Sequence, residues 1–124
     1  MSLLLRYTES VALPDFSGLY TRIGIEEIPV NSIRKAMAAL KQKAPSFILA
    51  EFIYAWSNNY ASCHISNLDS LLASIPKYAS GARVIVLAQR AELEYAGKLG
   101  EVYPLHGILP LPVSESELEA MLIK

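Results

Sequence analysis

The stretch "ARVIVLA", residues 82–88, decides the fold, because its centre holds four consecutive aliphatic residues without a polar interruption. Such a run is typical of a strand that is covered on both faces, as strands are in parallel sheets. Two further apolar runs of strand length flank it, "FILAEFIYA" (47–55) before and "GILPLPV" (107–113) after. We therefore predict three buried strands at 47–55, 82–88 and 107–113.

Two more strands are expected near the N-terminus. Residues 3–7 form a short apolar run, and "IEEIPV" (25–30) has apolar ends. Because Pro29 cannot donate to a strand ladder, the segment 25–30 is expected at an edge of the sheet. The intervening segment 13–24 contains Pro and Gly, so it is predicted to be a loop with at most a short helix.

The segments between the strands have apolar residues at helical spacing. The predicted helices are 32–43, which Asn31 or Ser32 can cap, 68–75, 89–101 and 114–124. Pro76 is expected to end the second of these, and Ser114 with Glu117 has the spacing of a capping box at the start of the last. Five strands alternating with helices predict an α/β fold, a doubly wound parallel sheet in a three-layer sandwich.

Composition limits the classes of function. The 124 residues are 52% hydrophobic and carry a net charge of −1, which fits one globular domain over residues 1–124. Such a charge provides no electrostatic basis for binding nucleic acid or an anionic membrane. The single Cys63 cannot form an internal disulfide, and the chain contains neither a signal-peptide pattern nor an apolar run of the ~20 residues that span a bilayer. We expect a cytoplasmic protein.

With this order of elements, the segment from about residue 25 to 124 resembles the receiver domain of bacterial response regulators. "SIRKAMAALKQKAPSFILAEF" (32–52) is similar to the family's second helix and third strand, "ARVIVLA" to its fourth strand, and "HGILPLPVSESELEAML" (106–122) to its fifth strand and helix. The resemblance implies a flavodoxin-like five-stranded fold. It also places Glu51 at the position of the phosphoacceptor aspartate.

The chain departs from the family at nearly all of the other chemical positions. The family's acidic pair falls on Tyr7 and Thr8, or on Thr8 and Glu9 if the register slips by one. The hydroxyl, the lysine and the switching aromatic residue are replaced by Ala88, Leu111 and Ile108, respectively. The proline that follows the lysine is retained as Pro112, and we expect a cis peptide bond before it.

Phosphoryl transfer to a carboxylate needs cations that offset the charge on the phosphoryl oxygens, and here neither the lysine nor a Mg²⁺ cage remains. We therefore expect a non-phosphorylatable pseudo-receiver without metal, cofactor or enzymatic activity, which acts by protein contact in bacterial signalling or regulation. Glu51 then has three interpretations. It could imitate a phosphorylated aspartate by its permanent charge, it could be a strand-end carboxylate that faces solvent or a neighbouring side chain, or it could be catalytic.

The partner is not identified by the sequence. The aromatic residues Tyr54, Trp56 and Tyr60 could anchor an interface, although Trp56 could equally fold back as a core plug. The four basic residues of 32–43 form either a solvated face or a surface for an acidic partner. In the family, the face made by the fourth helix, fifth strand and fifth helix mediates dimerisation, which makes a homodimer possible here.

Two alternatives complete the predictions. Cys63 and His64 are adjacent, and because neither a CxxC nor an HxxxH spacing accompanies them, a metal site or a cysteine nucleophile is not expected. The second function is a small α/β domain that binds or transforms a small molecule where the carboxyl ends of the strands meet.

Overall fold

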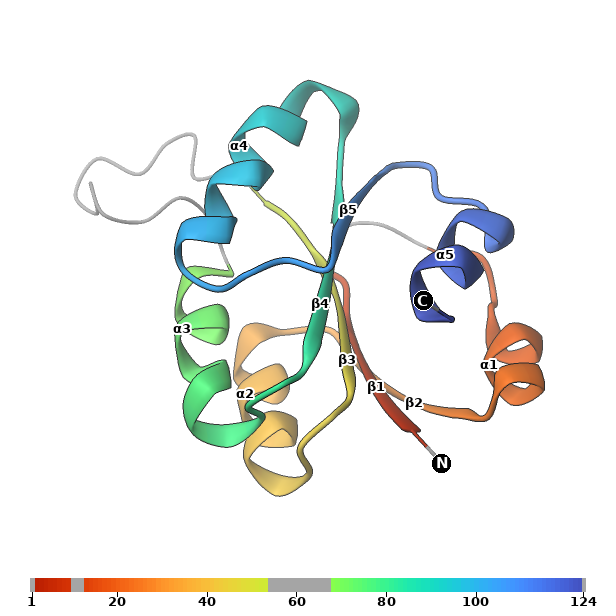
Figure 1. Cartoon of the computed structure of the whole chain (residues 1–124), viewed down its shortest axis with the longest axis horizontal. Coiled ribbons are helices and arrows are strands. Elements are labelled where there is room, and N and C mark those ends of the chain that lie inside the picture. The colour runs from red at the N-terminus through yellow and green to blue at the C-terminus, as the bar shows by residue number, and fades with distance from the viewer. Residues whose placement is uncertain (1, 10–12, 54–67, 124) are drawn as a thin grey trace.

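In a computed structural model, which describes residues 2–9, 13–53 and 68–123, the chain forms one five-stranded sheet between two layers of helices (Figure 1). The strands are β1 (Ser2–Tyr7), β2 (Ile25–Val30), β3 (Phe47–Glu51), β4 (Arg83–Ala88) and β5 (Gly107–Pro110). The helices are α1 (Ser17–Ile23), α2 (Ile33–Gln42), α3 (Asp69–Tyr78), α4 (Leu93–Gly97) and α5 (Glu115–Leu122), with 3₁₀ turns η1 (Arg90–Glu92) and η2 (Lys98–Glu101) beside α4.

All four strand pairs are parallel, and the strand order is β2-β1-β3-β4-β5. This is the flavodoxin-like order, so the predicted doubly wound sheet is confirmed. Figure 1 shows α2, α3 and α4 on one face of the sheet and α1 and α5 on the other. Because every strand runs in the same direction, the carboxyl ends of all five lie along one edge and the amino ends along the opposite edge.

The core consists of two apolar layers, one on each face of the sheet. Alternate side chains of β3 enter different layers: Ile48 packs in the α2–α3 layer and Leu49 in the α1–α5 layer, and neither is exposed to solvent. β4 alternates in the same way, with Val84 and Val86 on one side and Ile85 on the other. The sequence run 82–88 therefore covers both faces, as its unbroken apolar character predicts.

The structure corrects the bounds of several predicted elements. α3 continues through Pro76 to Tyr78, because this proline lies in the last turn, where its missing N–H removes only one bond of a helix that ends at once. The predicted strand 47–55 ends at Glu51, with residues 54 and 55 outside the described part. The predicted strand 107–113 ends at Pro110, since two prolines in this segment cannot donate to a ladder.

The predicted helix 89–101 is divided into η1, α4 and η2. Gly97 ends α4, and Gly100 lies within η2, so two poor helix formers stand near the end of the segment. Such residues favour short 3₁₀ turns over a continuous α-helix.

α5 begins with the predicted capping box, in which the Ser114 side chain accepts from the Glu117 amide and the Glu117 side chain accepts from the Ser114 amide. Arg22 of α1 reaches across to α5 and donates to Glu119 at 2.9 Å, and it lies 3.5 Å from Glu115. The hydrogen bond from Arg22 lowers the pKa of Glu119. The small stabilisation from this exposed pair is therefore present above the ordinary carboxyl pKa and is lost as the pH falls through the lowered value.

None of the helices in the described residues has the length and hydropathy that crossing a membrane requires.

Candidate functional site

The carboxyl edge of the sheet brings together most of the residues that the sequence singled out. Tyr7 is the last residue of β1, Glu51 the last of β3 and Ala88 the last of β4. Leu111 follows the last residue of β5, and its amide donates to the Ala88 carbonyl at 2.9 Å. In the ladder between β1 and β3, Tyr7 lies opposite Ala50, which is the residue before Glu51.

Glu51 is buried, with 3% of its surface exposed, which excludes the solvent-facing form of the strand-end carboxylate and leaves the form that faces neighbouring groups. Its Oε1 accepts a hydrogen bond from the backbone amide of Glu9 at 2.7 Å. The carboxylate of Glu9 in turn accepts a hydrogen bond from the hydroxyl of Tyr7. Glu9 is therefore held at both its amide and its carboxylate, and Glu51 fixes the start of the segment that follows β1.

Thr8 is buried beside the hydrogen bonds that join Glu51, Glu9 and Tyr7, which we call the latch. Its side chain faces a cation. Its hydroxyl oxygen accepts from Arg6 Nη1 at 3.2 Å, and its amide donates to the Val30 carbonyl at 3.3 Å. Arg6 Nε also lies 2.5 Å from Glu27 Oε2, in a half-buried ion pair. The charge of Arg6 is thus balanced within the fold.

The positions of the family's hydroxyl and lysine are filled by core residues. Ala88 has no exposed surface and packs in the α2–α3 layer. Leu111 packs in the α1–α5 layer, and the Leu111–Pro112 peptide bond is cis, as predicted. Ile108 is half-buried against the α2–α3 layer. No hydroxyl, ammonium group or aromatic ring stands at these three positions.

The residues present do not fit a Mg²⁺ ion. Mg²⁺ needs a near-octahedral set of oxygen ligands, usually with more than one carboxylate. Oxygen Oε1 of Glu51 accepts a hydrogen bond from the Glu9 amide, and the Glu9 carboxylate accepts one from the Tyr7 hydroxyl. Within residues 2–9, 13–53 and 68–123, no group of three or more His, Cys, Asp or Glu side chains could hold a metal ion.

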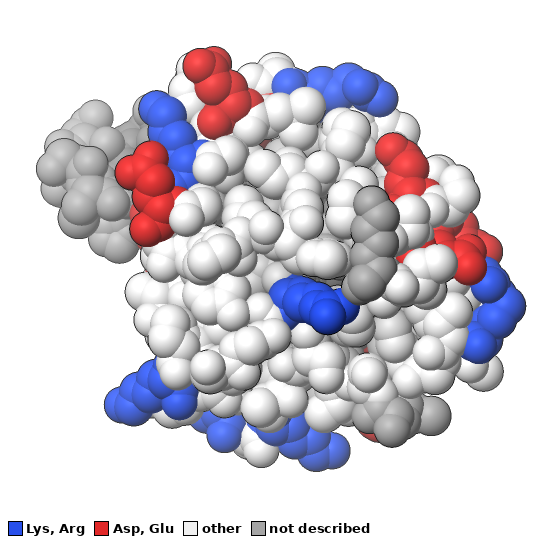
Figure 2. Space-filling view, in the orientation of Figure 1, with Lys and Arg blue, Asp and Glu red and all other residues white. Residues whose placement is uncertain are grey.

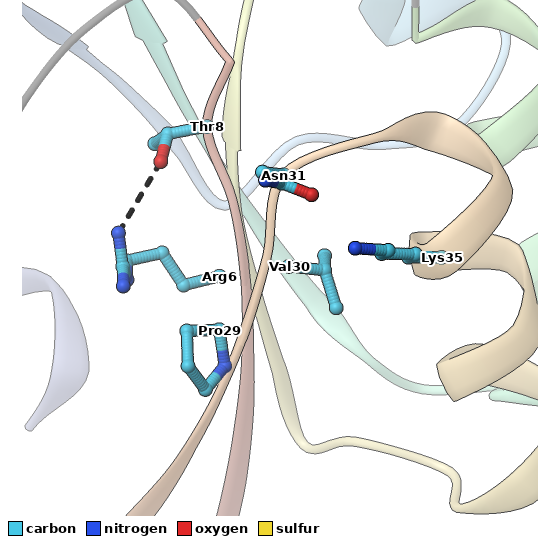
Figure 3. A pocket seen from close by; sticks show the side chains of 6 residues that line it. All are labelled: Arg6, Thr8, Pro29, Val30, Asn31 and Lys35. Atoms are coloured by element: carbon cyan, nitrogen blue, oxygen red, sulfur yellow. Dashed lines mark hydrogen bonds between the residues drawn. The ribbon is translucent and has the colours of Figure 1, made fainter.

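A pocket of about 280 Å³ lies at the same edge, where β1 and β2 end (Figure 3). Its lining residues are Arg6, Thr8, Pro29, Val30, Asn31 and Lys35. Figure 3 shows Arg6 and Lys35 on opposite sides of the end of β2, with the Arg6–Thr8 bond on one side. The N-terminal turn of α2 also borders the pocket, and its cap, Ser32, accepts from the Lys35 amide at 3.1 Å. Two basic side chains therefore line this pocket, and the charge of one of them, Arg6, is offset by Glu27.

The ion pair of Arg6 and Glu27 was not anticipated from the sequence. In the β1–β2 ladder, Glu27 lies opposite Leu4, and side chains alternate between the two faces along each strand. Leu4, Arg6 and Glu27 consequently share one face. Finding the pair requires the register between the two strands, which no single segment reveals.

Other predicted residues fall elsewhere. Tyr54, Trp56, Tyr60, Cys63 and His64 lie outside the described residues. His106 is described, and its Nε2 lies 2.7 Å from the Met121 carbonyl oxygen, which joins the start of β5 to the end of α5.

Comparison with solved structures identifies the class of fold. The chain is similar to a response regulator receiver domain protein from Clostridium thermocellum, with a TM-score of 0.72 and 16% identity over 99% of this chain and 92% of that one. It is also similar to the chemotaxis response regulator CheY4 of Vibrio cholerae, with a TM-score of 0.73 and 14% identity over 99% and 97% of the two chains. The chain therefore has the receiver fold, and the resemblance found in the sequence is confirmed.

Larger proteins contain the same fold. NtrX from Brucella abortus matches with a TM-score of 0.75 and 18% identity over 98% of this chain, which spans only 26% of the length of NtrX. No family model and no curated protein sequence matches the chain.

Proposed function

We propose that this chain is a non-phosphorylatable pseudo-receiver, which works in signalling or regulation by protein contact and has no enzymatic activity. The observation that carries the proposal is the state of Glu51. The carboxylate at the phosphoacceptor position is buried and already bonded to the Glu9 amide, instead of facing an open acidic pocket.

The surroundings of Glu51 support the same function. Stabilising a phosphoryl group requires preorganised cations and donors around the acceptor. The positions of the hydroxyl and the lysine hold Ala88 and Leu111, whose side chains belong to the two core layers. Binding a phosphoryl group there would place its charge beside apolar groups, at a large desolvation cost.

The first prediction concerns phosphoryl analogues. Addition of beryllofluoride with Mg²⁺, or of acetyl phosphate with Mg²⁺, should leave the amide resonances of Glu51, Ala88 and Ile108 unchanged and add no mass to the protein. The physical reason is the missing cation cage. Amide spectra of ¹⁵N-labelled protein and intact mass spectrometry measure both outcomes.

Mg²⁺ alone and fluoride alone serve as controls for this experiment. Saturable shifts centred on Glu51 that require beryllium, fluoride and Mg²⁺ together would overturn the non-phosphorylatable assignment.

A contact surface is proposed on the face formed by α4, β5 and α5. The exposed large apolar residues of the described chain are Val102 and Ile123, at the ends of η2 and α5. A hollow of about 280 Å³ adjoins Val102 in sequence; it is lined by Tyr103, Leu105 and four other residues, among them Ala82 and Arg83 where β4 begins. In Figure 2, the surface to the left of the centre and above it is largely uncharged, and one basic side chain lies at the centre of the view. Apolar surface of this kind favours a protein partner, and we propose a second copy of this chain.

The second prediction follows for self-association. The protein should form a dimer as its concentration rises from micromolar to near-millimolar, and the double variant V102E/I123E should stay monomeric, because it places charge in an apolar interface. Sedimentation velocity measures the distribution.

A variant with one added charge on each of two other helices, A38E on α2 with S74E on α3, is the control and should dimerise like the wild type. A wild-type protein that stays monomeric throughout this concentration range would rule out the homodimer.

The pocket between Arg6 and Lys35 favours a second candidate function, the binding of a small anion at the carboxyl edge (Figure 3). Its volume of about 280 Å³ is at the low end for ligand pockets, so only a small molecule would be accommodated. A concentration-dependent rise in melting temperature with inorganic phosphate or a small carboxylate, abolished in K35Q, would favour this function over the first.

A further inference from the structure

Basic side chains gather at the amino edge of the sheet, opposite the edge that carries Glu51. A hollow of about 450 Å³ lies there, which we call the amino-edge hollow. Its lining residues are Ser2, Ala44, Pro45, Ser46, Phe47, Ser80, Gly81, Ala82 and Arg83. The segments that line it follow the C-terminal ends of α2 and α3. In Figure 2, basic side chains lie along the lower edge, below α2 and α3, while most acidic ones lie at the upper and right margins.

Arg83 lines this hollow, and three further exposed cations lie at the C-terminal ends of the two helices that lead to it; together the four are called the cationic rim: Lys41, Lys43, Lys77 and Arg83. The ammonium groups of Lys41 and Lys77 lie 5.6 and 5.2 Å from the centre of the Tyr78 ring, so both are held over the same residue. The guanidinium of Arg83 lies 5.9 Å from the centre of the Phe47 ring. Aromatic rings thus position three of the four cations.

The ion pairs that Arg6 and Arg22 form in the described part of the chain do not include the three lysines of the rim. Glu26 at the start of β2 and Glu101 at the end of η2 lie toward this edge, but outside the segments that line the hollow. The rim therefore carries an excess of positive charge on a protein whose net charge is −1.

A structural role accounts for part of this arrangement. Lys41 and Lys77 lie in the last turns of α2 and α3, where a cation interacts favourably with the helix dipole. This explanation does not extend to Lys43, which is the extended C-cap residue of α2, or to Arg83, which begins β4. The number of cations exceeds what the two helix ends require.

From this charge distribution we infer that the amino edge binds an acidic segment of another protein. A carboxylate that entered the hollow would meet Arg83 and the hydroxyl-bearing side chains of Ser46 and Ser80. The carboxylates next to it along the acidic segment would meet the lysines of the rim. A short acidic peptide can stay within this local field. A long polyanion such as nucleic acid would also meet the acidic residues on the rest of the surface, which disfavours it.

This binding surface differs from Val102 and Ile123, the apolar residues of the contact face proposed above, although the hollow beside Val102 shares Ala82 and Arg83 with the amino-edge hollow. A pseudo-receiver with both surfaces could join its own copy, or another receiver-like partner, to an acidic protein. The inference does not depend on whether Glu51 can be phosphorylated.

The test uses ¹⁵N-labelled full-length protein and an octaglutamate peptide as probe. The peptide should shift the amide resonances of Ser46, Ser80, Gly81 and Arg83, and its affinity should fall as the salt concentration rises. The triple variant K41E/K43E/K77E should weaken binding at least tenfold. An octaglutamine peptide should produce no shifts.

The matched control changes three exposed cations elsewhere, R34E/R90E/K98E, so that the net charge changes by the same amount. This variant should bind the peptide within about twofold of the wild type, and thermal melts of both triple variants establish that they are folded. Equal weakening by the two variants, or peptide shifts outside the amino edge, would overturn the inference. Tighter binding of oligothymidylate, or of phosphatidylserine vesicles, to this same edge would also overturn it, since the occupant would then not be an acidic peptide.

Discussion

Replacing Leu49 with alanine should lower the free energy of unfolding by about 2–5 kcal/mol, the range for deletion of a buried leucine side chain. Leu49 lies in the central strand β3 and has no exposed surface. Its side chain packs in the α1–α5 layer with Leu4, Ile85 and Leu118. The loss combines the transfer free energy of the removed atoms with a cavity that the rigid sheet cannot close. Urea denaturation of the purified protein measures it.

The neighbouring residue makes this a test of the three-layer architecture. Ile48 is equally buried but packs in the α2–α3 layer, so Ile48→Ala should cost about as much as Leu49→Ala. A sheet with one face open to solvent would give one large and one small loss, which would contradict the observed layers. Ala38→Gly, at an exposed position of α2, is the low-cost control and should lose about 1 kcal/mol from helix propensity alone.

The strands were the part of the fold that the sequence predicted best. Residues 84–88 of the run are apolar on both of their alternating faces, and this pattern is typical of a strand that is covered on both sides. The ends of the elements were less predictable. In the sequence, Pro76 predicts the end of a helix, yet in the structure it lies within the last turn of α3. Whether a final turn survives depends on the tertiary packing of Ile75, which the local sequence does not contain.

The candidate site was predicted only as a set of positions. The resemblance to receivers aligned Glu51, Ala88 and Leu111 with the family's chemical residues, and the structure places all three at the carboxyl edge. The burial of Glu51 was not predicted. It depends on a bond to the backbone of Glu9, 42 positions away in the chain, and backbone donors leave no mark on a sequence.

Replacing Glu51 with alanine is expected to cost about 1–3 kcal/mol of unfolding free energy, because the Glu9 amide loses its hydrogen-bond acceptor and the removal of a buried side chain leaves a cavity. Glu51→Gln keeps an oxygen that can accept from the same amide. If the hydrogen bond matters and the charge does not, the glutamine variant should retain most of the stability that alanine loses. Urea denaturation at neutral pH compares the two.

The same pair of variants separates a structural latch from an imitation of the phosphorylated state. A permanent charge that held the domain in one conformation would have to act on the α4–β5–α5 face, but Ala88 and Ile108 offer neither a hydroxyl nor an aromatic ring that could respond to it. We therefore expect Glu51→Gln to perturb amide resonances near Glu9 and Glu51 and to leave those of α4, β5 and α5, and the self-association of the protein, unchanged. Shifts that extend to Ile108 and Val102, together with altered dimerisation, would instead show that the charge of Glu51 sets the conformation of the distant face. Tyr7→Phe, which removes the hydroxyl that donates to the Glu9 carboxylate and keeps the Glu51 carboxylate, is the control that assigns local shifts to the latch itself.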